Sequence, residues 1–316
     1  MKNLPIGVQT FQKMREKNYI YVDKTQFIYA IAEENSNGNY FLSRPRRFGK
    51  SLMVNTLKEL FLGNEHLFQG LWIYDKWDWS KTFPVIHLSF DAMDYRDLGL
   101  DKAISERMEE WAEFYGITLS KETYKGQFEE LLRKLYAQKG KVVLLIDEYD
   151  KPIIDYLERG ELPEALKNQK IMKNFYSVLK SSEQYLRFFF VTGISKFSRV
   201  SMFSDLNHIT DLTLHPSFTT ALGYTHQELE LYFEDHLQAA QDKMKVSREV
   251  LLDKIRIQYN GYSWDGVTKL YNPFGILNFF DQKWLLNFWF TTGMPSFLVK
   301  IMREKLVFDE IGRAHV

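Results

Sequence analysis

The residues with the clearest chemical potential lie in the stretch R-P-R-R-F-G-K-S, positions 44–51. Its end, Gly49-Lys50-Ser51, matches the second half of the phosphate-loop pattern G-x-x-x-x-G-K-[ST], but Arg44 occupies the place of the first glycine. In such a loop, backbone N–H groups at a helix start hold phosphate oxygens, the lysine reaches the β- and γ-phosphates and the hydroxyl ligates Mg²⁺. The alternative interpretation is a solvated basic turn formed by Arg46, Arg47 and Lys50.

A second pair of residues supplies the acids that such a loop needs. The apolar run V-V-L-L-I ends in Asp147 and Glu148. This layout predicts that Asp147 holds hydrated Mg²⁺ and that Glu148 orients and deprotonates the attacking water. Two acids at a strand end could also cap the following helix. The loop and the acids, in this order and with a strand between them, are together more specific than either motif alone.

The next apolar run, Y-L-R-F-F-F-V-T-G-I-S, also ends in polar residues. Thr192 is the first candidate for contact with the γ-phosphate or the water, and Ser195 is the second. Capping of the strand end by Thr192 is the alternative. Arg199 is a candidate arginine finger that neutralises charge in the transition state, with a solvated surface arginine as its alternative.

Strands that alternate with helices must position these residues. We expect short strands at 40–43, 83–91, 141–150, 185–195 and 208–214, and helices from Lys50 to about Gly63, at 98–115 and at 121–139. This alternation is typical of an α/β fold in which helices cover both faces of a mostly parallel sheet. We assign 1–216 to this core with its N-terminal segment. Residues 217–310 contain amphipathic helices with N-cap candidates at Thr225 and Ser247, and are expected to form a smaller, mostly helical lid or second domain.

Composition narrows the class of protein. Lys plus Arg and Asp plus Glu number 41 each, so the formal net charge is zero, which argues against a dedicated DNA-coating protein. The sequence has no cysteine, and no apolar run approaches the ~18 residues that cross a bilayer. We therefore expect a cytoplasmic protein that does not enter the membrane.

The last six residues, I-G-R-A-H-V, match one reading frame of a common sequencing adapter. We interpret 311–316 as a non-native tail, and expect the natural protein to continue beyond about Glu310.

Several longer motifs resemble the AAA-ATPase-like family of bacterial proteins. They are Y-V-D-K-T at 21–25, F-L-S-R-P-R-R-F-G-K-S-L at 41–52, L-L-I-D-E-Y-D-K-P-I at 144–153, T-G-I-S-K-F-S at 192–198, Y-N-G-Y-S-W-D-G at 259–266, L-Y-N-P-F-G-I-L-N-F-F at 270–280 and F-W-F-T-T-G-M-P-S-F-L at 288–298. The resemblance implies a P-loop NTPase core of the additional-strand type, followed by a small helical region. It also implies that ATP is bound by the family's own form of the loop, Arg44, Pro45, Arg46, Arg47, Phe48, Gly49, Lys50, Ser51 and Leu52. Many members carry a further C-terminal domain similar to PD-(D/E)xK nucleases, for which this chain has no room.

We therefore expect an ATP-binding protein, a Mg²⁺-dependent ATPase that drives a switch or an effector domain. Ser51 and Asp147 would hold the metal. A nucleotide-gated binding or signalling module with little turnover is one alternative. The ATPase part of a nucleic-acid processing protein is another. A homo-oligomer is expected if one of the arginines acts across an interface.

Overall fold

The computed structural model describes residues 1–194, 209–286 and 288, and centres on one parallel sheet. Its strands are β1 (Asn39–Ser43), β2 (Val85–Ser89), β3 (Val142–Asp147), β4 (Leu186–Gly193) and β5 (Thr210–Asp211). They lie in the order β2-β3-β4-β1-β5, and every neighbouring pair is parallel. Strand β4 thus lies between β1, which precedes the Gly-Lys-Ser motif, and β3, which ends in Asp147. This topology confirms the predicted α/β fold of the additional-strand type.

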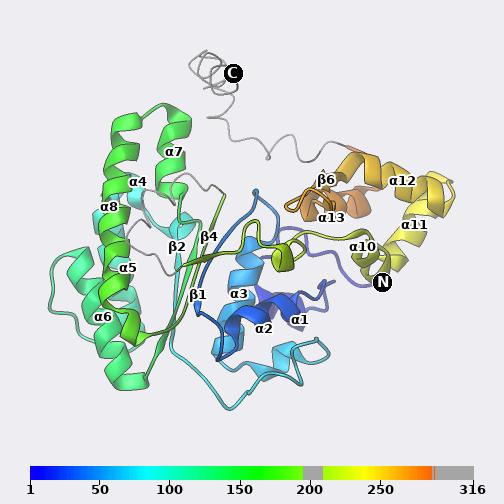
Figure 1. Ribbon diagram of the computed structural model, residues 1–316. Coiled ribbons are helices and arrows are strands. Elements are labelled where there is room, and N and C mark those ends of the chain that lie inside the picture. The colour runs from blue at the N-terminus through cyan, green and yellow to red at the C-terminus, as the bar shows by residue number, and fades with distance from the viewer. Residues whose placement is uncertain (195–208, 287, 289–316) are drawn as a thin grey trace.

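Helices cover both faces of the sheet (Figure 1). One face packs against α5 (Leu100–Phe114), α6 (Tyr124–Lys139) and α8 (Leu162–Ser181). The other packs against α1 (Phe11–Glu16), α2 (Thr25–Ala32) and α3 (Lys50–Phe61). Along β3, Val142, Leu144 and Ile146 join the first layer, and Val143 and Leu145 join the second. This alternation is the period of two that a strand buried on both faces requires.

Short elements complete this part of the chain. They are α4 (Tyr95–Leu98), α7 (Lys151–Arg159) and the 3₁₀ turns η1 (Glu65–Phe68), η2 (Phe90–Ala92), η3 (Glu183–Tyr185) and η4 (Pro216–Phe218). The predicted strands are all present. Strand β1 begins one residue earlier than predicted, and the other four are shorter than their predicted ranges. The most shortened is β5, with two residues in place of the expected run from 208 to 214.

The later residues form helices α10 (His226–Tyr232), α11 (Glu234–Met244), α12 (Arg248–Tyr259) and α13 (Pro273–Gln282), with a hairpin of β6 (Asn260–Tyr262) and β7 (Leu270–Tyr271). Both predicted N-caps are present: Thr225 caps α10 in a capping box with Glu228, and the Ser247 hydroxyl caps α12. These helices share a core of their own, which also takes in Ile20 and Val22 from the N-terminal segment. Because this core contains residues from both sides of 216/217, the predicted domain boundary at that position stays a prediction.

Among the helices of the described residues, none is both long and apolar enough to span a bilayer.

Candidate functional site

The loop between β1 and α3, residues 44–49, has the geometry of an anion cradle and is called the phosphate loop below. Gly49 is the residue before α3 and lies in the left-handed region, with a φ of 97°. Glycine adopts this conformation without the steric cost that a Cβ would bring. It turns the chain directly into α3, so that the unpaired N–H groups of the first helical turn are available to an anion.

Lys50, the first residue of α3, is buried at the base of this loop. Its Nζ donates to the carbonyl oxygen of Pro45 at 3.0 Å. Burial lowers the pKa of Lys50, while the carboxylates of Asp147, Asp150 and Glu148 act in the opposite direction. A cation in a dry site with one carbonyl partner has donor capacity left for a strongly charged acceptor.

Asp147 ends β3 beside Lys50 and is also buried. Its Oδ1 accepts a hydrogen bond from the Glu148 backbone N–H at 2.9 Å. Burial raises the pKa of Asp147, while a hydrogen bond from the Ser51 side chain and the charge of Lys50 act in the opposite direction. The Ser51 hydroxyl and the Asp147 carboxylate thus meet in this structure. Two oxygen ligands in contact, beside a phosphate loop, are the donor set that Mg²⁺ takes, so these residues fit the ion.

Glu148 follows in a left-handed conformation, with a φ of 52°. A non-glycine residue in this region is strained, and such strain is concentrated at functional sites. Burial raises the pKa of Glu148, and the charges of Asp147 and Asp91 raise it further. A carboxylate with a raised pKa is a better general base than an exposed glutamate.

The three loop arginines, which the sequence does not distinguish, have three different environments. Arg44 is buried. Its Nη1 donates to the carbonyls of Ser43 at 2.9 Å and Thr213 at 2.8 Å, and its Nη2 donates to that of Phe218 at 3.2 Å. Burial lowers its pKa to about 10. We therefore assign Arg44 a structural role in place of the predicted phosphate contact.

Arg47 lies over an aromatic ring of the later helical region. Its guanidinium carbon is 3.8 Å from the centroid of the Phe274 ring. The next residue, Phe48, is buried, with its ring centroid 4.7 Å from that of Tyr262. Both side chains therefore contact the later helical region, and their role in nucleotide binding stays a prediction.

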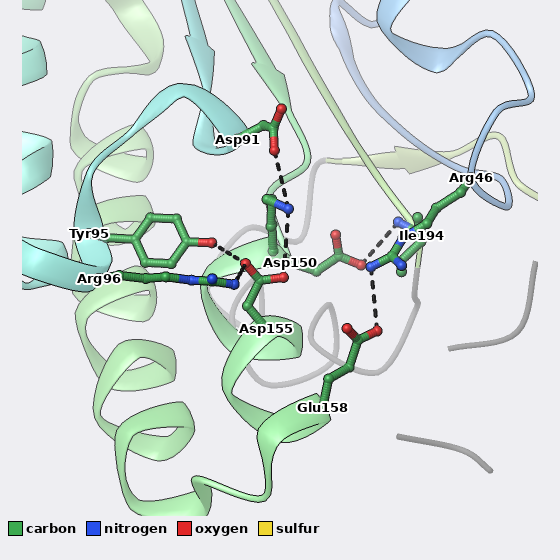
Figure 2. Close-up of polar contacts among 9 residues, drawn as sticks. Arg46, Asp91, Tyr95, Arg96, Asp150, Asp155, Glu158 and Ile194 are labelled. Carbon is green, nitrogen blue, oxygen red and sulfur yellow. Dashed lines mark hydrogen bonds and ion pairs between the residues drawn. The ribbon is translucent and has the colours of Figure 1, made fainter. Parts of the chain in front are cut away.

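Arg46 alone points toward the acidic side of the site. Figure 2 shows its side chain reaching to Glu158 of α7, with an Nη2–Oε1 distance of 3.4 Å. Three residues earlier on α7, Asp155 accepts from the Tyr95 hydroxyl at 2.7 Å and from the Arg96 guanidinium at 2.5 Å (Figure 2). Helix α7 begins just after Glu148, so it links the catalytic candidate to the phosphate loop.

Thr192, the third predicted catalytic residue, is buried inside the sheet. Its hydroxyl donates to the Leu42 carbonyl at 2.6 Å and so bridges β4 and β1. The structure thus shows this hydroxyl bound to a neighbouring strand. Ser195 and Arg199 lie outside the described residues.

A nearby acid, Asp150, was not singled out from the sequence. It is buried, and its Oδ2 accepts from the Ile194 backbone N–H at 3.0 Å, as Figure 2 shows. A Cβ on Gly193 would lie 2.5 Å from Asp150 Oδ1, so the end of β4 is closed against this carboxylate.

A pocket beside the phosphate loop was also missed. Most of its lining is apolar, and it opens next to Gly49, Leu52 and Met53 at the start of α3. The remaining walls come from the N-terminal segment, the turn before α10 and the start of α13, and include Ile20, Tyr21, Val22, Ile28, Ala221, Leu222, Gly223, Tyr224 and Pro273. Its parts are far apart in the sequence, so no motif could have marked it.

Comparisons with known proteins identify the family of this chain. A family model described as AAA-ATPase-like, predicted AAA-ATPase, matches residues 5–203. An uncharacterized protein in the vnfD 5' region of Azotobacter chroococcum mcd 1 is 42% identical over 310 residues, which is 97% of this chain and 57% of that protein. The chain therefore spans little more than half the length of this curated relative.

Among solved structures, the chain is similar to the Aeropyrum pernix Orc1 protein in complex with DNA. The similar region covers 74% of this chain and 56% of the Orc1 chain, with 14% sequence identity and a TM-score of 0.35.

Proposed function

Because the chain belongs to the AAA-ATPase-like family, whose members are predicted P-loop ATPases, we propose that it binds ATP with Mg²⁺ at the phosphate loop and hydrolyses it. The observation that carries this proposal is the meeting of Lys50, Ser51, Asp147 and Glu148 at one edge of the sheet, from two elements nearly a hundred positions apart in the chain. A solvated basic turn would not bury its lysine among three carboxylates.

In the proposed complex, the N–H groups at the start of α3 receive phosphate oxygens, and Lys50 exchanges its Pro45 carbonyl for a phosphate. Ser51 and Asp147 hold the metal, which supplies charge neutralisation at the phosphates when bound. Arg46 is the loop arginine left to contact phosphate, since Arg44 and Arg47 are occupied elsewhere.

Glu148 is proposed as the general base. Its carboxylate accepts a proton from the attacking water, and the raised pKa favours that transfer. Its neighbour Asp91 ion-pairs with Lys151 at 3.2 Å, so a counter-charge stands close to the base.

We assign the apolar pocket to the nucleobase. It adjoins Gly49, and a mostly apolar lining with a few polar groups is typical of small-molecule and cofactor sites. Lys24 lines it, but its Nζ is held by Glu228 and by the Thr220 carbonyl at 2.8 Å.

The test is the affinity of the purified chain for Mg-ATP, measured by calorimetry, with Lys50→Ala against Lys58→Ala. Lys58 is on the same helix, is partly exposed and ion-pairs with Glu59. A hydrogen bond to a charged group contributes about 1.5–3 kcal/mol, so we expect Lys50→Ala to bind about 10- to 150-fold more weakly and Lys58→Ala to bind as the wild type does. Equal affinities in all three proteins would rule out this site.

Turnover is tested separately. Phosphate release that depends on Mg²⁺ should be lost in Glu148→Gln, while Mg-ATP binding persists. Binding without release in the wild type would instead favour a nucleotide-gated module with little turnover. The relative is longer than this chain, so we propose that the reaction serves a further part of the protein.

A further inference from the structure

Three rings from the later helical region hold the phosphate loop from its outer side, and we call Tyr262, Trp264 and Phe274 the aromatic clamp. Arg44 lies 4.4 Å from the centroid of Trp264, and Arg47 lies 3.8 Å from that of Phe274. Between them, Phe48 packs edge-on against Tyr262, with the ring planes at 71°. All three rings lie beyond residues 5–203, the span of the family match.

On the loop side of these contacts, Arg47 has an unusual backbone conformation. Arg47 adopts a left-handed backbone conformation, with a φ of 66°, which costs a non-glycine residue about 1–3 kcal/mol. Its side chain is exposed and lies over Phe274, so the cation–π contact contributes about 0.5–1 kcal/mol toward keeping that conformation. The loop is therefore shaped in part by residues more than two hundred positions away.

The aromatic clamp also determines which basic side chains of the phosphate loop remain near Asp147 and Glu148. It takes up Arg44 and Arg47, and leaves Lys50 and Arg46 on the side of Asp147 and Glu148. Without the aromatic clamp, the phosphate loop and its arginine side chains would become ordered only when a nucleotide binds. The entropy cost of that ordering would reduce the affinity for the nucleotide.

We propose that Phe274 and Trp264 are positioning residues for nucleotide binding, which keep the phosphate loop in its anion-binding shape and couple its occupancy to the helical region. The inference rests on the proposed function. Coupling between two sites is reciprocal, so a nucleotide that needs the clamped loop must also stabilise the clamp. Residues 260–274 should then become more protected when Mg-ATP is bound.

The experiment is a double-mutant cycle on Mg-ATP affinity with Arg47→Met, Phe274→Leu and the double variant. Leucine keeps an apolar side chain on a partly exposed site, so folding is not at risk, and thermal unfolding of each variant verifies it. The matched control is Trp72→Leu. Trp72 lies under Lys76 at 4.4 Å in the same kind of contact, away from the loop. Amide hydrogen exchange of 260–274, with and without Mg-ATP, is the second readout.

We expect Phe274→Leu and Arg47→Met each to weaken Mg-ATP binding about two- to fivefold, without further loss in the double variant, and Trp72→Leu to have no effect. The protection of 260–274 by nucleotide should shrink in Phe274→Leu. If the wild type binds Mg-ATP and Phe274→Leu binds it equally well or better, the positioning role is wrong while the proposed function stands. If the wild type does not bind Mg-ATP, both fall.

Discussion

Arg44 stands where the general phosphate-loop pattern has glycine, so Arg44→Gly restores that pattern. We predict that it nevertheless damages the protein. The guanidinium donates to three carbonyls, of which those of Thr213 and Phe218 belong to the segment that follows β5. Glycine would leave these buried acceptors without their donor and remove the contact with Trp264.

The magnitude follows from these contacts. A buried polar group without a partner costs about 1–3 kcal/mol, and the carbonyls of Thr213 and Phe218 would both lose their donor. We therefore expect Arg44→Gly to lower the free energy of unfolding by about 4 kcal/mol. For a chain of this size, that corresponds to a Tm lower by roughly 10 °C.

The assay is thermal and urea unfolding of Arg44→Gly, Arg44→Lys and Arg133→Ala. Lysine keeps the charge but cannot reproduce the forked contacts, so it should lie between the wild type and glycine. Arg133 is exposed on α6, and its replacement should change stability by no more than about 0.5 kcal/mol. If Arg44→Gly unfolds at the same temperature as Arg133→Ala, the structural role assigned to Arg44 is refuted.

Two further predictions concern the charges around the cradle. The exposed Arg46–Glu158 ion pair contributes at most about 1 kcal/mol, so Glu158→Gln should release Arg46 and tighten Mg-ATP binding by up to about fivefold. The same substitution should have no effect on Mg-ATP affinity in an Arg46→Ala background. Weaker binding by Glu158→Gln would contradict this prediction. Burial raises the pKa of Asp147, so without ligand its charge destabilises the folded state increasingly as pH rises through the window above its unfolded pKa of about 3.9. At neutral pH and without Mg-ATP, Asp147→Asn should therefore be more stable than the wild type, and the difference should vanish at low pH. Thermal unfolding of both proteins measured against pH tests this. A wild type that is more stable than Asp147→Asn at neutral pH would contradict it.

The sheet was predictable because its signal is local. The run before Asp147 is apolar at every position, and all six residues of β3 are buried. A strand that is buried on both faces of a sheet has a nearly continuous apolar sequence, so its burial can be predicted from its composition. The position of β5 was also predicted, but its length was not, because a two-residue edge strand is defined by its pairing with Tyr40 and Phe41.

The positions of Asp147, Glu148 and Lys50 were predictable for the same reason, since each residue lies where a strand ends or a helix begins. Thr192 shows where this reasoning stops. A hydroxyl at the end of a buried strand can face the site or the neighbouring strand, and sequence alone does not decide between them. In this fold the Leu42 carbonyl lies within reach, and the hydroxyl donates to it.

The place of Arg44 could not be predicted, because its partners are set by the tertiary fold. Thr213 and Phe218 are 169 and 174 positions away, and Trp264 is further still. The first glycine of the general pattern gives the backbone freedom at the start of the loop. Here the backbone N–H of Arg44 donates to the Gly193 carbonyl at 3.3 Å, so the chain leaves β1 still attached to β4, and the left-handed turn is made later, at Arg47 and Gly49. An arginine is tolerated at 44 because the left-handed turns of the loop come after it, and it stabilises the loop because it binds the segment that follows β5.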